Sequence, residues 1–535
     1  MAPAFDYVIV GAGAAGCVLA ERLSADLRTR VCLIESGPSD KSPLVAMPKG
    51  FGKLLSDPGH AWFFPVAPSR GVNRQEVWAR GRMLGGSSSI NGMMYTRGDP
   101  AEYDAWAEAG CAGWGAAEMA EAFCAIEDHA LGAGEGLWRR GAGGPLHVSL
   151  QRERHPACDA FLSAAESVGL RRKLDINDAD IEGVGYFPRT IKNGKRWSAA
   201  DAFLRPAEKR ANLTVLMHGD VLRIVFDGTR ACGVELRRDG RLETLNAARE
   251  IVLCAGALNS VKLLQLSGVG PAAALKAAGI EVRADRAQVG RRMREHRVLF
   301  LQYRARKAAW SRNRELRGLG LLASVLNYAL FKRGVMALGA FEVGGFFKSR
   351  PDLARCDGQF FFSPVSIDPD DPMSPETAPG VQCLALPLRP ISEGFVEIIS
   401  PAPDAPLRIE PNLLAAPEDR AAMLGAIRFV RRIFAEPPLA DLIEGETSPG
   451  AQVQTDEDLL SAVDRLGLCG YHAIGTCRMG ADDDDVVDPR LRVRGVSGLR
   501  VMDCSVMPTM ASGNTNGPVM AMAWRAADLI RADAR

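Results

Sequence analysis

The stretch FDYVIVGAGAAG, residues 5–16, decides the fold. It opens with a short run of apolar and β-branched residues at 7–10, which is typical of a strand buried on both faces. Gly11, Gly13 and Gly16 follow in the pattern G-x-G-x-x-G. In this pattern the first glycine permits a tight turn, the second lets backbone approach a pyrophosphate, and the third lets the next helix pack on the strand. The N-terminus of that helix supplies N–H donors and a partial positive charge for phosphates.

A second strand and an acidic residue follow in the order that a dinucleotide site requires. Residues 31–34 are again a short apolar run, and Glu35 ends it 19 residues after Gly16. A carboxylate at this position reaches the ribose hydroxyls of an adenosine. Because it would repel a 2′-phosphate, it disfavours NADP. The order of strand, glycine motif, helix, strand and acid predicts a Rossmann-like dinucleotide-binding domain.

The composition is that of an ordinary globular protein. The chain has 535 residues, of which 47% are apolar, and its 65 basic and 64 acidic side chains give a formal net charge of +1. This balance excludes the basic surface that nucleic acid requires, so no nucleic-acid partner is expected. The length predicts about two to four domain-sized units.

Cysteine usage and the N-terminus favour a cytoplasmic protein. The 12 cysteines form no C-x-x-C pair, and scattered free thiols suit a reducing compartment. Cys469, His472 and Cys477 lack the fourth ligand and the spacing of a zinc site, so no metal is expected. The residues before the first strand carry no basic or apolar segment typical of a signal peptide. The sequence makes no prediction of the oligomeric state.

The longest apolar stretch covers residues 319–331, with Lys332 and Arg333 directly after it. It is shorter than the roughly 20 apolar residues that span a bilayer, so no transmembrane segment is expected. It could form a buried helix, lie on a membrane surface or line a substrate entrance. We expect the buried helix, with peripheral membrane contact as the less favoured alternative.

A second glycine-rich loop identifies the family. Residues 81–92, GRMLGGSSSING, are small and rich in backbone donors, which suits close wrapping of a polar planar ligand. This loop resembles the first signature of the glucose–methanol–choline (GMC) oxidoreductases, a family of flavoproteins. Residues 256–270 resemble the second signature, with Val261 in place of the usual Pro or Ser. Residues 499–508 and 513–518 also match, so the resemblance extends from about residue 5 to 531.

The resemblance implies FAD as the cofactor. Gly86 and Asn91 would line the isoalloxazine, and Asp503 would lie near the pyrophosphate–ribitol end. Val221 would either contact adenine through its backbone or be a plain sheet residue. Some members tether the flavin through a histidine where this chain has Ile90, so we expect non-covalent FAD. The positions that match the family's cofactor site are Gly11, Gly13, Ala14, Ala15, Gly16, Glu35, Ser36, Arg82, Leu84, Gly85, Gly86, Ser87, Asn91, Gly92, Met93, Met94, Val221, Ala255, Tyr471, Asp503, Cys504, Thr515, Asn516 and Pro518.

The same resemblance implies a catalytic pair. His472 lies between small residues that leave room for a ligand, and histidine has the pKa of a general base near neutral pH. It matches the family's catalytic histidine, and Asn516, 44 residues later, matches its partner. His296 also matches a family motif, although Glu295 stands where Asp is usual, and we expect it to have a structural role. The run 482–485 of four aspartates predicts a solvated loop.

The chemistry implied is oxidation of a primary alcohol to the aldehyde. His472 would accept the hydroxyl proton while the hydride moves to flavin N5, and Asn516 would orient the oxygen. The pattern is similar to bacterial aryl-alcohol and 5-hydroxymethylfurfural oxidases, which favours an aromatic or furfuryl alcohol as the small-molecule substrate, with O2 as acceptor giving H2O2.

The pattern is also similar to choline-dehydrogenase-like enzymes that use a quinone or cytochrome as the electron acceptor. Glu342 could face a cationic substrate or serve a packing or hydrogen-bonding role. A redox-silent lyase or decarboxylase is a further alternative.

The resemblance implies an α/β architecture with two domains. Residues 1–150, 190–300 and 465–535 would form a discontinuous FAD-binding domain. Residues 151–190 and 301–464 would form a substrate domain with a largely antiparallel sheet and flanking helices. Within it, 394–399 alternates as a half-buried strand, 413–436 has helical spacing, and the proline-rich stretch 364–390 predicts a loop and an edge strand.

Overall fold

A seven-stranded sheet forms the core of the dinucleotide-binding part. The computed structural model describes residues 5–68, 75–369, 371 and 374–534. The strand order is β10-β2-β1-β13-β12-β11, with β24 also paired to β13. The pairs from β10 through β13, and that of β24, are parallel, whereas β11, β12 and β13 pair antiparallel. The strands are β1 (Phe5–Val10), β2 (Val31–Ile34), β10 (Leu213–Leu216), β11 (Asp220–Asp227), β12 (Arg230–Arg238), β13 (Arg241–Leu253) and β24 (Leu499–Val501).

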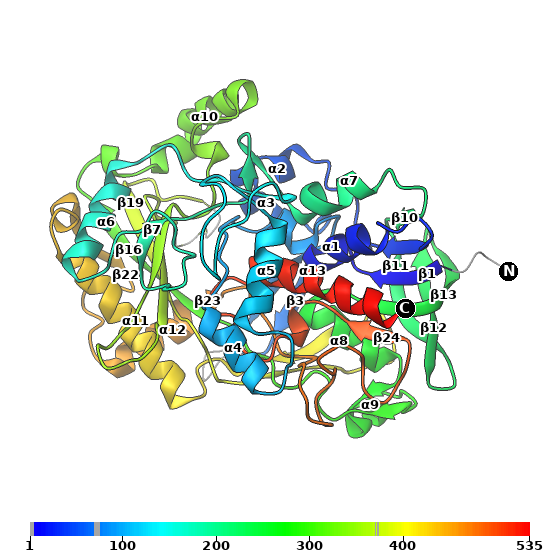
Figure 1. Cartoon of the computed structure of the whole chain (residues 1–535). Helices are drawn as coiled ribbons and strands as arrows, with labels where there is room; N and C mark the ends of the chain where they lie inside the picture. Colours follow the sequence, from blue (N-terminus) through cyan, green and yellow to red (C-terminus); the bar gives the residue numbers. More distant parts are fainter. Residues whose placement is uncertain (1–4, 69–74, 370, 372–373, 535) are drawn as a thin grey trace.

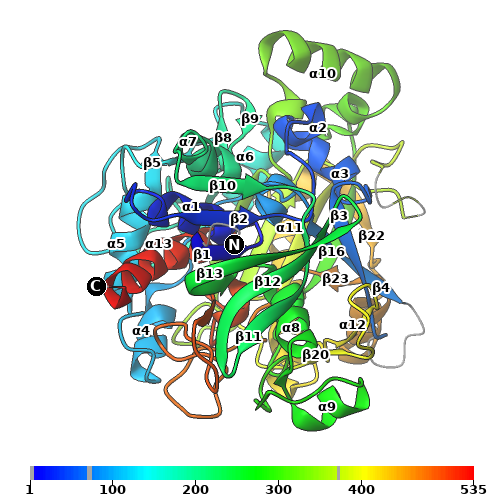
Figure 2. The same cartoon turned by 90° about the vertical axis from the view of Figure 1, so that its right-hand side faces the viewer.

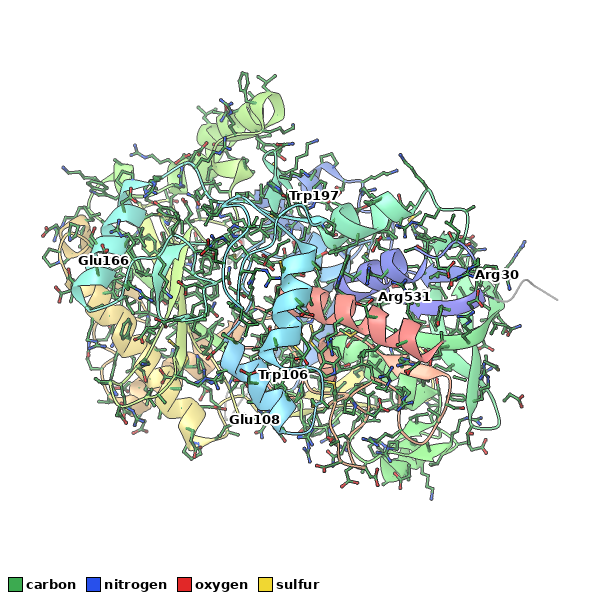
Figure 3. All side chains as sticks on the ribbon, viewed as in Figure 1. Arg30, Trp106, Glu108, Glu166, Trp197 and Arg531 are labelled. Carbon is green, nitrogen blue, oxygen red and sulfur yellow. The ribbon has the colours of Figure 1, made fainter. Side chains whose placement is uncertain are left out.

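Two helices from opposite ends of the chain lie together beside this sheet. Helix α1 (Ala14–Leu23) follows the glycine motif, and α13 (Asn516–Asp533) comes from the other end of the chain. The two pack side by side (Figures 1 and 2). Helix α4 (Pro100–Glu108) carries the buried Trp106, which is labelled in Figure 3. Its Nε1 donates to Thr509 Oγ1 at 2.7 Å and so holds the segment before α13 against α4.

A second, antiparallel sheet forms the other half of the molecule. Its order is β17-β18-β19-β16-β22, with β23 paired to β16. Helices α6 (Pro156–Ser167) and α11 (Pro417–Ala435) pack on it, and α12 (Asp456–Leu466) contacts β16. This arrangement confirms the predicted fold class. The strands are β16 (Arg297–Ala305), β17 (Val343–Phe347), β18 (Gly358–Ser363), β19 (Gly380–Pro387), β22 (Ile443–Ser448) and β23 (Leu468–Cys469).

The predicted ranges of the two domains follow the sheets except at two strands. All seven strands of the first sheet fall within 1–150, 190–300 and 465–535. Strand β16 crosses the boundary at residue 300, and β23 lies within 465–535 although it pairs in the second sheet. The boundaries themselves stay a prediction.

Of three local predictions, one was wrong, one is confirmed, and one fails at a single residue. The strand in 364–390 is β19, which lies between β18 and β16 and is buried throughout, so it is no edge strand. Its prolines do not break the ladder because Pro387 is its last residue. The half-buried strand expected in 394–399 is confirmed as β20 (Phe395–Ile398), in which half-buried and buried residues alternate; it pairs with β21 (Leu407–Glu410) outside the second sheet. In the run 482–485, residues 482–484 are exposed in a loop as expected, whereas Asp485 is buried and pairs with Arg478.

The apolar stretch 319–331 forms a helix that is not buried. Helix α10 (Gly318–Phe331) has one buried residue, Tyr328, and stands out from the rest of the molecule (Figures 1 and 2). The expectation failed because an apolar run of this length has no polar face to show which side is covered. Among the described residues, no helix combines the length and apolar character needed to cross a membrane.

Candidate active site

The turn between β1 and α1 forms a cradle suited to a pyrophosphate. A Cβ on Gly16 would overlap the Gly11 carbonyl, so that glycine permits the close packing of helix on strand. A Cβ on Gly13 would meet nothing closer than the Cys254 carbonyl oxygen at 3.8 Å, so this side of the turn is open. Gly13 is the N-cap of α1, without a side-chain cap or an acid in the first turn. The free N–H groups therefore fit an anionic group.

Glu35 closes this turn from the end of β2. Its Oε2 accepts the Ala12 N–H and its Oε1 accepts the Gly37 N–H, both at 2.9 Å. Burial raises the pKa of Glu35 to about 7, although these two hydrogen bonds act in the opposite direction. The Gly219 N–H donates to the Glu35 carbonyl at 3.0 Å, which brings Val221 and the start of β11 to this end of the cradle. Both alternatives for Val221 stay open.

The second glycine-rich loop packs directly on the first. It follows β4 (Glu76–Gly81) and includes the short helix η2 (Gly86–Ser89). The Gly85 N–H donates to the Ala12 carbonyl at 2.8 Å, and a Cβ on Gly86 would lie 2.8 Å from Gly13 Cα. The structure thus brings together two glycine-rich motifs that are about 70 residues apart in the chain.

Three predicted cofactor residues also hold the loops in place. Asn91 Oδ1 accepts from Arg196 Nη1 at 2.8 Å. Arg82 lies 3.5 Å from Asp220 and stacks over Trp62. Asp503 Oδ2 accepts the Gly256 N–H at 2.9 Å and the Ser260 hydroxyl at 2.6 Å, which fixes the start of α8 (Gly256–Leu266). The other predicted residues lie in these same loops or beside His472: Ala14, Ala15, Ser36, Leu84, Ser87, Gly92, Met93, Met94, Ala255, Tyr471, Cys504, Thr515 and Pro518.

Strand pairing between β16 and β23 brings two histidines together. Arg297 pairs with Cys469, and the Gly470 N–H donates to the His296 carbonyl at 2.8 Å. His296 Nδ1 then lies 2.9 Å from His472 Nδ1, although the residues are 176 apart in sequence. The expectation that His296 is structural therefore needs refinement, because its ring contacts the predicted base directly.

The hydrogen-bond chain fixes which nitrogens carry protons. His296 Nε2 is 3.0 Å from the Leu388 carbonyl oxygen, which can only accept, so Nε2 carries the hydrogen. Burial lowers the pKa of His296 to about 4 and that of His472 well below its usual value, so both rings are neutral at pH 7. His296 Nδ1 therefore accepts from His472 Nδ1–H. This leaves a lone pair on His472 Nε2, as a general base requires.

Asn514 donates to that lone pair. Its Nδ2 is 3.1 Å from His472 Nε2. Asn516, the predicted partner, is the first residue of α13 and is half-buried between buried neighbours. Among the described residues no hydrogen bond joins Asn516 to His472. The role predicted for Asn516 stays a prediction, and Asn514 is a residue that the sequence reasoning missed although it lies in the same motif, 513–518.

A buried carboxylate holds the two histidine segments. Glu295 Oε1 accepts the N–H groups of His296 and His472 at 2.8 and 2.7 Å, and its Oε2 is 3.3 Å from Arg80. Burial raises the pKa of Glu295 to about 7, against the effect of Arg80. Ligand atoms of Glu295, His296 and His472 lie within 4.8 Å of one another, but each residue already takes part in this hydrogen-bond network. Neither Glu295 nor Arg80 was assigned a site role from the sequence.

An apolar wall borders the catalytic chain. It includes Leu388, whose carbonyl fixes His296, and Met94 of the glycine-rich loop. Phe300 and Phe341 have ring centroids 6.3 Å apart and are only half-buried, as is Leu468. These half-buried side chains leave part of the cluster's apolar surface exposed.

Comparison with known proteins agrees with this geometry. The family model described as GMC oxidoreductase matches residues 5–298 in its N-terminal part and 390–523 in its C-terminal part. The chain belongs to the GMC oxidoreductase family. Members of this family bind FAD, and the uncapped α1 N-terminus with the open side of Gly13 fits the pyrophosphate of that cofactor.

Full-length relatives extend this result. Oxygen-dependent choline dehydrogenase of Rhizobium etli is 39% identical, over 98% of this chain and 95% of its own length. Alcohol dehydrogenase [acceptor] of Pseudomonas putida is 37% identical, with the same coverage of each chain. The crystal structure of pyridoxine 4-oxidase from Mesorbium loti superposes with a TM-score of 0.89 at 32% identity, covering 99% of both chains.

In this GMC oxidoreductase, Glu342 is neutralised within the protein. Its side chain is buried, Arg312 Nε donates to Oε1 at 2.9 Å, and Gln151 donates to Oε2. Burial alone would raise the pKa of Glu342, but the charges of Arg312 and Arg189 outweigh it and hold the pKa below its usual value. Glu342 thus takes part in a buried ion pair and a hydrogen bond, which corresponds to the packing or hydrogen-bonding alternative.

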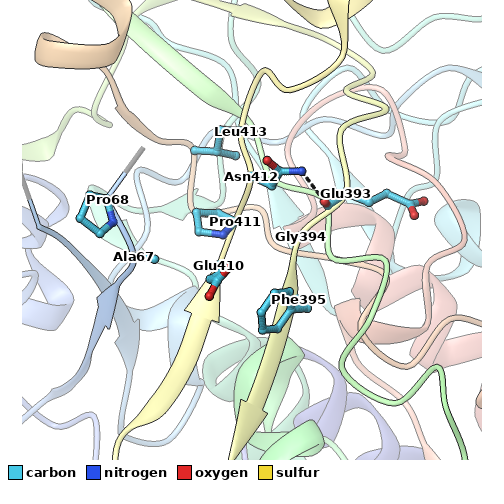
Figure 4. Close-up of a pocket in the computed structure, with 9 residues that line it drawn as sticks. All are labelled: Ala67, Pro68, Glu393, Gly394, Phe395, Glu410, Pro411, Asn412 and Leu413. Atoms are coloured by element: carbon cyan, nitrogen blue, oxygen red, sulfur yellow. Dashed lines mark hydrogen bonds between the residues drawn. The ribbon is translucent and has the colours of Figure 1, made fainter. Parts of the chain in front are cut away.

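A separate hollow of about 320 Å³ lies between the segment after β3 (Ala61–Val66) and the β20–β21 pair (Figure 4). Asn412 Nδ2 donates to the Glu393 carbonyl at 3.1 Å on its wall. Its lining contains none of the predicted catalytic residues. The hollow is therefore distinct from the catalytic chain.

Proposed function

We propose that this GMC oxidoreductase converts a neutral primary alcohol, aromatic or furfuryl in type, to the aldehyde, with O2 as the acceptor that yields H2O2. Family membership makes it an FAD-dependent oxidoreductase acting on alcohols. The observation that carries the proposal is the chain from Leu388 through His296 to His472, which leaves a lone pair on His472 Nε2.

The chain's own residues manage the proton. When bound, FAD supplies the acceptor for the hydride of the carbinol carbon. His472 Nε2 takes the hydroxyl proton, displacing the amide of Asn514 from its lone pair. Asn516, at the uncapped start of α13, holds the same oxygen in place. Glu295, next to both histidine segments, favours the positive charge that forms on His472.

Two features support a neutral and apolar substrate. Glu342 is the carboxylate that could attract a cationic alcohol, but its negative charge is balanced by the ion pair with Arg312. The half-buried Phe300, Phe341 and Met94 offer aromatic and thioether contacts to a flat ring. For these reasons we assign an aromatic alcohol rather than a choline-like one, although several relatives carry the name choline dehydrogenase.

The acceptor has two candidates. O2 is supported by the likeness to pyridoxine 4-oxidase. A lipid-soluble quinone is the second candidate, because the apolar face of α10 is exposed on the surface.

An anaerobic titration tests the reaction. Purified protein with bound FAD is mixed with benzyl alcohol, 5-hydroxymethylfurfural or choline in the absence of air. We expect the flavin colour to bleach with the two aromatic alcohols and to persist with choline. Bleaching by choline alone would contradict the substrate, and no bleaching by any alcohol would favour redox-silent chemistry.

His472 is tested in the same assay. We expect His472→Ala to slow flavin reduction by about 10²–10⁴-fold while FAD remains bound. The control is His147→Ala, since His147 pairs with Asp128 away from the site. Normal reduction in the His472 variant would overturn the assignment.

A further inference from the structure

Helix α10 presents its apolar side to the outside. Leu319, Leu322, Leu326, Leu330 and Phe331 are between 54% and 86% exposed. A surface helix of a globular protein ordinarily buries this stripe against the core. A contiguous exposed apolar surface of this kind marks an interaction site.

The inward face of α10 is small and polar, so the helix is held in this orientation. Gly320, Ser324 and Tyr328 recur every four residues and are its least exposed positions. A Cβ on Gly320 would overlap the Arg314 carbonyl, and the Tyr328 hydroxyl donates to the Ala46 carbonyl at 3.1 Å. These contacts fix the helix on the protein with its leucines turned away.

Basic residues surround the apolar face at both ends. No charged residue occurs in α10 itself. Arg314 and Arg317 precede it, and Lys332 and Arg333 follow it. The hairpin of β8 (Ile191–Lys192) and β9 (Lys195–Arg196) packs against Lys332 through Gly194, which adds the exposed Lys195. Two acids lie close to these ends: Glu315 pairs with Arg312, and the exposed Glu153 accepts the Gly334 N–H at 3.2 Å. The four basic residues that flank the helix outnumber them.

This pattern fits an anionic lipid surface. Fourteen residues give a helix of about 21 Å, which is shorter than the roughly 30 Å hydrocarbon core but suited to lying in the plane of the interface. We propose that α10 binds an anionic phospholipid bilayer, with its leucines among the acyl chains and the basic residues at its two ends on the headgroups.

A second copy of the chain is a poorer occupant. In either a parallel or an antiparallel pair of α10 helices, each basic end would face another basic end. Like charges at such a contact oppose association. An anionic bilayer complements both ends at once.

The helix also connects to the flavin loop. Past α10 the chain runs through η6 (Val335–Ala337), and the Ala340 N–H donates to the Gly92 carbonyl at 3.1 Å. The bilayer-facing helix is thus attached close to the loop that lines the cofactor site. Membrane binding itself does not rest on the proposed reaction.

Co-sedimentation with lipid vesicles tests the proposal. FAD-loaded protein is mixed with vesicles of phosphatidylcholine alone or with phosphatidylglycerol added. We expect binding to the anionic vesicles that weakens as salt rises and weaker binding to phosphatidylcholine alone. The double variant Leu322→Glu/Leu326→Glu should bind at least about tenfold more weakly, because it places two charges in the acyl region.

The matched control is Leu27→Glu/Leu242→Glu. These leucines are 71% and 67% exposed on the dinucleotide-binding part, and the variant should bind vesicles like the unaltered protein. The flavin spectrum and turnover of both variants should be unchanged, which excludes unfolding. A third variant, Arg314→Gln/Arg333→Gln, should lose the preference for anionic lipid.

Three results would overturn the proposal. One is absence of vesicle binding by the unaltered protein, and another is equal binding by the α10 variant. The third is a dimer in vesicle-free buffer that Leu322→Glu/Leu326→Glu splits, together with no vesicle binding, which would make α10 an interface between copies.

Discussion

The lone pair on Nε2 of His472, which we propose as the base, is set by a backbone carbonyl two hydrogen bonds away. The Leu388 carbonyl selects one tautomer of His296, and His296 in turn selects one tautomer of His472. Burial keeps both rings neutral at pH 7. The protein therefore sets the proton position before substrate arrives, which is a form of preorganisation.

The two asparagines near His472 should affect different kinetic constants. Asn514 binds the free base, and the alcohol must displace it, so Asn514→Ala should change KM with little change in kcat. Asn516 is proposed to hold the reacting oxygen, so Asn516→Ala should lower kcat by about tenfold or more. Steady-state kinetics of both variants with one alcohol give the answer. If Asn514→Ala lowered kcat more than Asn516→Ala does, Asn514 rather than Asn516 would hold the reacting oxygen.

Glu295 should produce a pH dependence near 7 that His472 does not. Burial raises the pKa of Glu295 to about 7, whereas that of His472 lies well below 6.5, so His472 stays neutral throughout this range. As pH rises through 7, Glu295 gains a negative charge that stabilises a protonated His472. We therefore expect the rate of anaerobic flavin reduction to rise across this range.

The variant Glu295→Gln tests whether Glu295 causes this rise of the flavin-reduction rate with pH. It keeps an oxygen acceptor for the two N–H groups but cannot ionise, so the rate should become flat between pH 6 and 8 (about one unit on each side of the pKa). If the rate for the variant still rose near pH 7, the pH dependence would come from a group other than Glu295.

The sequence indicated His472 but not its environment. His472 lies between small residues, and this local pattern is visible in the sequence. Its contact with His296 depends on the pairing of β16 with β23, elements that are far apart in the chain. The roles of Asn514 and Glu295 depend on the same tertiary arrangement, so no spacing rule could predict them.

At the scale of elements, the β1–α1–β2 unit was fully predictable. Its strands, turn and acid are specified within residues 5–35 by short-range patterns. The central place of β19 and the exposed position of α10 were not predictable in this way. In both, an apolar run shows that a surface needs covering but not which partner covers it.

The glycines of the first turn should separate folding from cofactor binding. A Cβ at Gly16 would overlap the Gly11 carbonyl, whereas one at Gly13 would meet no protein atom within van der Waals overlap. We expect Gly16→Ala to lower the melting temperature of the FAD-free protein. Gly13→Ala should leave that temperature nearly unchanged and weaken FAD affinity by about tenfold or more, because its methyl group faces the pyrophosphate.

Thermal melts without FAD and a fluorescence titration with FAD measure the two effects. Gly445→Ala is the control, because Gly445 lies in β22, its φ is not positive, and a Cβ there would have no neighbour within 4 Å. Equal loss of stability in the Gly13 and Gly16 variants would show that Gly13 serves packing rather than the cofactor.

At the scale of the whole molecule, the site forms where the two sheets meet. His296 directly precedes β16 of the antiparallel sheet, whereas the cofactor turn follows β1 of the parallel sheet. The base is thus held by one half and the cofactor cradle by the other. Phe300 and Phe341 belong to an apolar cluster separate from the one beneath the dinucleotide cradle, so we propose that they can set substrate specificity without disturbing the cradle.

The exposed helix α10 bears on which electron acceptor reoxidises the flavin, because a membrane-bound quinone would reach the site only if α10 held the protein on the bilayer. After anaerobic reduction by an aromatic alcohol, we expect the flavin colour to return quickly on admission of air, in wild type and in Leu322→Glu/Leu326→Glu alike. O2 reaches the site by diffusion, so its reaction should not depend on a helix at the surface. Anionic vesicles containing a quinone should add little to this rate. Slow recovery in air combined with fast recovery on quinone vesicles, lost in the α10 variant, would instead identify a membrane-bound dehydrogenase in which the bilayer delivers the acceptor.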